Sequence, residues 1–227
     1  MWNIITGTTP SPRRTTPEEN QDRYGHTTIG DTCLIVAADG AGSQPNSREG
    51  AQYAVEQALS LFETTYHEGG ATEENITALL KNVYDNFHYN YNADVKQYAT
   101  TVALAILTPK RWVAAAVGDS FIVVDDSLEY FYVSDDSGEY VNETVFLSAP
   151  TLNPVIKHGN TPRLAAAATD GLKNVSVENG VPYLGFWESI KKMSSPDQLE
   201  QLFEQMREEY RLTDDTTIVC VKAGRPE

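Results

Sequence analysis

The sequence predicts an α+β fold in which short antiparallel strands are layered against helices. Two helical patterns come first, four short strand patterns follow at close spacing, and a helix and a strand close the chain. Strands and helices do not alternate regularly, which argues against a doubly wound parallel sheet. With 227 residues, 41% of them apolar, we expect one folded domain over residues 1–227.

A first strand is expected over residues 2–8. A loop follows it, because Pro10, Pro12 and Pro17 exclude regular structure. Residues 32–38 are apolar on both of their alternating faces, which is typical of a strand that is covered from both sides.

Two amphipathic helices are predicted next. Asn46 and Glu49 have the spacing of a capping box at the start of the first helix. Its apolar stripe comprises Ala51, Ala54, Val55, Ala58, Leu59 and Phe62. The second helix begins near Thr72, and its stripe comprises Ile76, Leu79, Leu80, Val83 and Phe87.

The second half of the chain changes character. Short strand patterns at hairpin spacing cover residues 101–107, 112–117, 121–124 and 130–133. Residues 134–162 show no clear pattern, and we expect an irregular insertion or a lid there. Ser195 followed by Pro196 predicts a helix start, and a last strand is expected over residues 216–222.

The composition limits the classes of partner. A net charge of -15 repels nucleic acid backbones and anionic membranes, so neither is expected to bind. No signal peptide and no membrane-spanning segment is recognisable. Cys33 and Cys220 lie in apolar runs, as buried and reduced thiols would. These features predict a soluble cytoplasmic protein, and surface solvation accounts for most of the acidity.

Three distant segments place aspartate beside an apolar run. Asp39 and Asp170 each follow such a run and precede glycine, while Asp214 and Asp215 precede one. Strand ends can bring these carboxylates to one rim of a sheet, where they repel one another unless a cation lies among them. Carboxylate oxygens suit Mg²⁺ or Mn²⁺. The pattern therefore favours a metal-dependent enzyme.

Each motif taken singly has an ordinary structural interpretation. An Asp-Gly pair after a strand is more often a plain turn than a metal site. By the same reasoning Gly118-Asp119-Ser120 would be a hairpin turn, and Asn20-Gln21-Asp22 would be a polar loop. The combination of the motifs, in one order along the chain, is what favours a functional site.

The chain resembles the metal-dependent protein phosphatases of the protein phosphatase 2C family, and in particular the compact bacterial branch. Six segments carry this resemblance, in the family's order and across nearly the whole chain. They are Asn20-Gln21-Asp22, Ala38 to Ser43, Ala99-Thr100-Thr101, Val117 to Ser120, Ala168 to Leu172, and Asp214 to Thr217. Chance agreement at six ordered places is improbable.

The resemblance implies a central β-sandwich of two antiparallel sheets flanked by helix pairs, which gives four layers (αββα). It also implies a metal site in a cleft at one edge of the sandwich. Asp39 would bridge two Mg²⁺ or Mn²⁺ ions, and the carbonyl of Gly40 would ligate one of them. Asp170 and Asp214 would hold the other ion.

By the same resemblance, Asp22 would ligate a metal or orient its water, and Asp119 would join Asp170 at a weaker third ion. A metal-activated water would attack the phosphorus of phosphoserine or phosphothreonine, so no side-chain nucleophile is needed. The chemistry would rest on Asp22, Asp39, Asp170 and Asp214. The implied substrate is a protein phosphorylated by a Ser/Thr kinase, and we expect a monomeric phosphatase.

Three positions depart from the family pattern. Gln21 stands where many relatives have glutamate, and Ala41 stands where many eukaryotic relatives have a histidine. The place of a phosphate-gripping arginine falls near Pro17. Arg13 and Arg14, just upstream, either replace that arginine or are solvated loop residues.

Two other functions stay open at this point. One is a pseudophosphatase, a regulatory binding module that keeps the fold without turnover. Gln21 and Ala41 favour it, whereas the intact Asp39, Asp170 and Asp214 oppose it. The other is a hydrolase for a small phosphorylated metabolite, which a panel of substrates would separate from a protein phosphatase.

Overall fold

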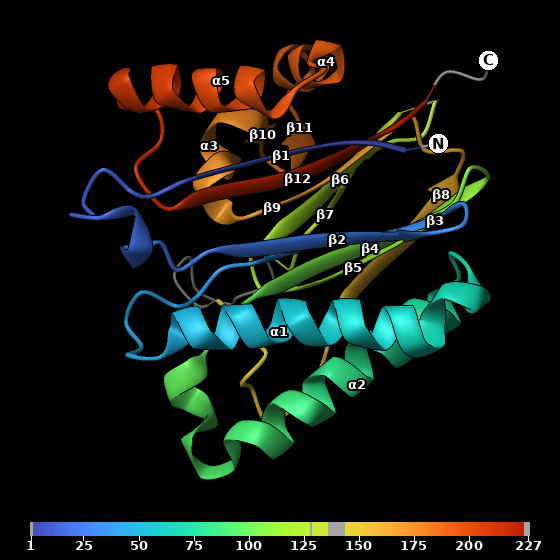
Figure 1. Cartoon of the computed structure of the whole chain (residues 1–227), viewed down its shortest axis with the longest axis vertical. Helices are drawn as coiled ribbons and strands as arrows, with labels where there is room; N and C mark the ends of the chain where they lie inside the picture. Colours follow the sequence, from blue (N-terminus) through green and yellow to red (C-terminus); the bar gives the residue numbers. More distant parts are fainter. Residues whose placement is uncertain (1, 128, 136–143, 225–227) are drawn as a thin grey trace.

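The computed structural model describes residues 2–127, 129–135 and 144–224. Two five-stranded antiparallel sheets face each other, and helices cover the outer face of each sheet (Figure 1). The expected αββα layering is confirmed. No helix in these three stretches combines the length and the apolar character that a membrane span requires.

The first sheet has the strand order β2-β3-β4-β5-β8. Its strands are β2 (Arg23–Ile29), β3 (Thr32–Ala38), β4 (Val102–Leu107), β5 (Arg111–Val117) and β8 (Val155–Asn160). Helices α1 (Ser47–Leu61) and α2 (Glu73–Tyr91) pack on its outer face and bury their apolar stripes there.

The second sheet has the strand order β1-β12-β9-β6-β7. Its strands are β1 (Trp2–Thr9), β12 (Thr216–Ala223), β9 (Leu164–Ala168), β6 (Phe121–Asp125) and β7 (Tyr130–Val133). Helices α4 (Leu184–Lys192) and α5 (Pro196–Glu208) cover its outer face. The short α3 (Lys173–Ser176) and the hairpin of β10 (Val177–Glu178) and β11 (Val181–Pro182) lie between β9 and α4 in the chain.

The central strands are buried on both faces, as the apolar run of residues 32–38 predicts. In β3, Leu34 and Val36 face α1 and α2, whereas Cys33 and Ile35 face the second sheet. The same division recurs in β9 and β12. Three hydrophobic layers result, one between the sheets and one under each helix pair.

The predicted strands of residues 101–133 are confirmed, but the hairpin expected at Gly118-Asp119-Ser120 is wrong. β4 and β5 do pair, whereas β5 and β6 belong to different sheets. Gly118 has φ +82°, and a Cβ there would lie 2.5 Å from the Val145 carbonyl oxygen. Glycine therefore permits the crossing between sheets that brings Asp119 to the rim of the sandwich.

Two further expectations need correction. The Asn46 side chain makes no capping hydrogen bond; instead its backbone N–H donates to Gln97, which ties the start of α1 to the 3-10 helix Asn92–Tyr98. Residues 134–162 contain a regular strand, β8, at the edge of the first sheet. The lid expected within this stretch falls partly on 136–143, which lie outside the described residues.

Gly171 allows two strand ends to approach each other closely. A Cβ at this position would lie 2.0 Å from the backbone oxygen of Asp215. We expect Gly171→Ala to lower the free energy of unfolding by about 1–3 kcal/mol, because overpacking forces the backbone apart. Thermal denaturation of Gly171→Ala against Gly42→Ala tests this, since a Cβ at Gly42 meets nothing closer than 3.6 Å. Equal melting temperatures would contradict the close approach.

Candidate active site

Strand ends from both sheets meet at one end of the sandwich. Asp39 follows β3, and Asp119 lies in the crossing from β5 to β6. Asp170 follows β9, and Asp214 lies just before β12. Because β9 and β12 are antiparallel, with Ala168 opposite Ile218, the end of one strand lies beside the start of the other.

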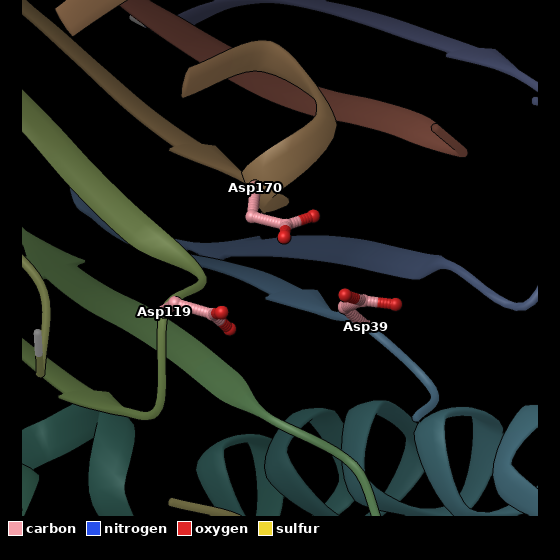
Figure 2. Close-up of side chains that lie close together, drawn as sticks. All are labelled: Asp39, Asp119 and Asp170. Atoms are coloured by element: carbon pink, nitrogen blue, oxygen red, sulfur yellow. The ribbon is translucent and has the colours of Figure 1, made fainter. Parts of the chain in front are cut away.

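Asp39, Asp119 and Asp170 form a compact carboxylate cluster. One oxygen from each lies within 4.8 Å of the others, and the side chains converge from three segments (Figure 2). The Thr144 hydroxyl donates a 2.9 Å hydrogen bond to Asp119 Oδ2. Oxygen donors at this spacing fit a hard divalent cation such as Mg²⁺ or Mn²⁺.

Two consecutive threonines hold the backbone of Asp39. The Thr100 hydroxyl and the Thr101 N–H both donate to the Asp39 carbonyl, at 2.8 and 2.9 Å. In return, the Asp39 N–H donates to the Thr101 hydroxyl oxygen at 3.1 Å. The motif Ala99-Thr100-Thr101 therefore fixes the backbone position of Asp39 in the cluster.

Asp22 is a buried carboxylate beside this cluster. The Thr169 hydroxyl donates to its Oδ2 at 2.6 Å, while its Oδ1 is buried without a hydrogen-bond partner in the described structure. Burial, with the nearby charge of Asp215, raises the pKa of Asp22 to about 7. An orphaned carboxylate oxygen at a cluster of acids fits a site that takes a cation or its water.

The cluster itself is electrostatically unfavourable as it stands. Burial raises the pKa of Asp39 well above its ordinary value, and the charges of Asp22 and Asp170 raise it further. Burial, with the charges of Asp119 and Asp214, raises the pKa of Asp170 to about 6. A divalent cation would remove this repulsion, so the residues present fit the metal that the sequence predicts.

Asp214 and Gly40 lie at the border of the cluster. Asp214 is exposed and stands outside the group of three, although its charge contributes to the raised pKa of Asp170. Gly40 pairs with Thr100, and a Cβ on it would lie 2.8 Å from the Ser47 carbonyl. The start of α1 thus excludes a side chain at residue 40.

The sequence analysis gives Asp215 no role apart from Asp214, but in the structure Asp215 holds the N-terminal loop against the site. It is 3% exposed and accepts hydrogen bonds from the N–H groups of Ser11 (2.7 Å) and Gln21 (2.9 Å). It also forms a 2.9 Å ion pair with Arg14, whose Nη2 donates to Gln21 Oε1 at 2.8 Å. Asp215 and its partners in the N-terminal loop are about two hundred residues apart in the chain. The sequence therefore offers only one local signal for this contact, the two consecutive aspartates before β12.

Comparisons with known proteins identify the family and the fold of the chain. A family model described as "Protein phosphatase 2C" matches residues 13–209. No curated protein matches the chain.

Solved bacterial phosphatases share the fold over almost their whole length. The serine/threonine phosphatase Stp1 from Staphylococcus aureus is 18% identical, with a TM-score of 0.74 over 99% of this chain and 96% of that one. The S. agalactiae serine/threonine phosphatase is 16% identical, with a TM-score of 0.74 over 99% of this chain and 100% of that one. The Mycobacterium tuberculosis phosphatase PstP/Ppp is 14% identical, with a TM-score of 0.73 over 99% of both chains.

The raised pKa values predict how the metal-free protein responds to pH. Asp22 and Asp170 bind protons in the folded chain up to about pH 7 and about pH 6, whereas the ordinary value is 3.8. The folded state therefore binds more protons, and the free energy of unfolding in EDTA falls as the pH rises from 4 to 7. Mg²⁺ or Mn²⁺ should restore stability at neutral pH.

Thermal denaturation across this pH range is the measurement. Asp39→Asn should stabilise the metal-free protein at neutral pH by an amount on the order of 1 kcal/mol, because one repelling charge is removed. The exposed Asp31→Asn serves as the control. A metal-free stability that increases with pH would contradict the electrostatic account.

Proposed function

Since the chain belongs to the protein phosphatase 2C family, whose members are phosphoric monoester hydrolases, we propose that it is an active, metal-dependent serine/threonine protein phosphatase. The observation that carries the proposal is the convergence of Asp39, Asp119 and Asp170 within 4.8 Å. A pseudophosphatase would have no need to keep three mutually repelling carboxylates at one point.

In this proposal Asp39, Asp170 and Asp214, together with the Gly40 carbonyl, would hold two Mg²⁺ or Mn²⁺ ions. Asp119 and Asp170 would hold a weaker third ion. When bound, such cations lower the pKa of water and neutralise charge on a phosphoryl group. Asp22, whose Oδ2 accepts a hydrogen bond from Thr169, would orient a water through its Oδ1, which has no hydrogen-bond partner among the described residues.

The two cysteines support water as the nucleophile. Burial raises the pKa of Cys33 to about 11 and that of Cys220 to about 12, so both thiols stay protonated at neutral pH. Both lie in the interior of strands, β3 and β12, away from the ends that carry the aspartates.

Arg14 is our candidate for the group that binds the substrate phosphate. Asp215 orients its guanidinium, and Arg14 in turn holds Gln21, next to Asp22. The Arg14 side chain keeps 26% of its surface exposed, whereas Asp215 is buried. A guanidinium anchored on one edge can present its other N–H groups to a phosphate.

We further propose that residues 1–227 act as a single catalytic domain and that the protein is monomeric and cytoplasmic. Its substrates would be proteins phosphorylated by a Ser/Thr kinase. The acidic net charge of -15 supports the absence of nucleic acid and membrane partners.

Phosphate release from a phosphothreonine peptide tests the activity. We expect release with Mn²⁺ or Mg²⁺ and none with EDTA. Asp39→Asn should lower turnover by more than about a hundredfold while the fold is retained, because even changes around metal ligands cost about 10–100-fold. Asp31→Asn should retain full activity.

Three results would overturn this assignment. Wild-type turnover by Asp39→Asn would contradict the metal mechanism. Cation binding by calorimetry without any release would indicate a binding module. Release from small phosphorylated metabolites but not from peptides would indicate a metabolite hydrolase.

Arg14→Ala tests the phosphate contact. We expect KM for the phosphopeptide to rise about tenfold with little change in kcat, because the contact is made with the substrate before and during reaction. The adjacent, exposed Arg13→Ala is the matched control and should leave KM unchanged. Equal effects of the two variants would show a general charge effect instead.

A further inference from the structure

Arg23 and Arg48 border the proposed active site from two different elements. Arg23 begins β2 and lies opposite Ala38, the residue before Asp39. Arg48 lies in the first turn of α1, where its backbone nitrogen is 3.1 Å from the place that a Cβ on Gly40 would take. The two arginines therefore flank the segment that carries Asp39 into the acid cluster.

The side chain of Arg23 lies on the side of β2 that faces α1. Successive side chains of a strand alternate between its two faces, so Arg23 and Gly25 share one face. α1 covers this face, because a Cβ on Gly25 would lie 2.8 Å from Val55 Cγ1. Since α1 and β2 begin at the same end of the sandwich (Figure 1), Arg23 lies near the start of α1, which carries Arg48.

Neither arginine is neutralised by an ion pair with a described residue. Arg23 is partly buried, and its Nη1 donates to the carbonyls of Asn20, at 3.1 Å, and Asp22. Its Nε and Nη2 have no acceptor in the described part of the chain. Arg48 is exposed and makes no hydrogen bond to any described residue. Several N–H donors are therefore available to an anion at this place.

The two positive charges also repel each other. Burial lowers the pKa of Arg23, and the charge of Arg48 lowers it further, although Asp22 and Asp215 act in the opposite direction. Glu18 does not neutralise Arg48. A hydrogen bond to its own backbone is the main reason why the pKa of Glu18 is lowered, and Arg48 adds to this effect without forming an ion pair. An anion that meets both guanidinium groups would relieve their repulsion.

We propose that Arg23 and Arg48 bind an acidic side chain of the phosphoprotein substrate, close in sequence to its phosphorylated residue. This inference rests on the proposed phosphatase function and adds a substrate preference to it. The carboxylate of aspartate or glutamate matches the planar donors of a guanidinium group. An extended peptide advances about 3.3 Å per residue, so we expect the acidic residue within about three positions of the phosphorylated one. The net charge of -15 repels such a peptide elsewhere on the surface, which makes local positive charge the determinant of where it binds.

Peptide turnover measures this preference. Phosphothreonine peptides with one glutamate, placed at each of about three positions on either side of the phosphothreonine, are compared with the same peptides carrying glutamine. For at least one position we expect KM to be about three- to fivefold lower with glutamate and kcat to be unchanged, which is the size of an exposed ion pair. The difference should shrink as the NaCl concentration rises.

Charge reversal at Arg48 is the sharpest variant. Arg48→Gln should abolish the preference for glutamate, and Arg48→Glu should reverse it, so that lysine is favoured at the same position. Arg111→Gln is the matched control and should keep the preference, because Arg111 is exposed at the end of β5 that lies away from Asp119. No preference at any position, an unchanged preference in Arg48→Glu, or an equal loss in Arg111→Gln overturns the proposal.

A binding measurement separates this inference from the proposed activity. Fluorescence anisotropy of the same peptides, carrying a dye, gives the ratio of the affinities for the glutamate and glutamine forms without any turnover. Absence of phosphate release from every peptide would contradict the phosphatase function, whereas an affinity ratio of about threefold that disappears in Arg48→Gln would still support this inference. Phosphate release without such a ratio would overturn the inference and leave the phosphatase function standing.

Discussion

Mutual repulsion of buried carboxylates is the constraint around which this end of the molecule is built. Asp39, Asp119 and Asp170 meet within 4.8 Å, with Asp22 buried beside them. The hydrogen bond from the Thr169 hydroxyl stabilises the Asp22 carboxylate, but the pKa values of Asp22, Asp39 and Asp170 remain raised. This repulsion is unfavourable for folding without a metal. A bound cation relieves it, so the relief adds to the free energy of cation binding.

The sandwich supplies the rigidity that holds the acids together. Central strands buried on both faces, such as β3 and β9, cannot slide without moving apolar side chains out of two hydrophobic layers. Asp39 and Asp170 lie just after β3 and β9, and Asp119 lies in the crossing between the sheets. Their positions are therefore set by core packing rather than by the loops alone.

Asp214 and Asp215 show how adjacent residues take different tasks. Asp214 is exposed and near Asp170, whereas Asp215 is buried and binds Ser11, Arg14 and Gln21. Asp215 thus connects the N-terminal loop to the site. Its ion pair with Arg14 also ties the proposed phosphate-binding group to this loop.

The local sequence pattern predicted the α+β class, the helices α1, α2 and α5, and the apolar strands. It could do so because the spacing of apolar residues along a short segment distinguishes a helix from a strand. It also proposed the aspartates at strand ends. The polar edge strands β2 and β8 lacked that signal, since only one side of an edge strand is covered. The passage of the chain between sheets at Gly118, the meeting of Asp39 with Asp119 and Asp170, and the pairing of Asp215 with Arg14 were decided by tertiary structure alone. Those contacts join segments far apart in the chain, and only the packing of two sheets and two helix layers brings them together.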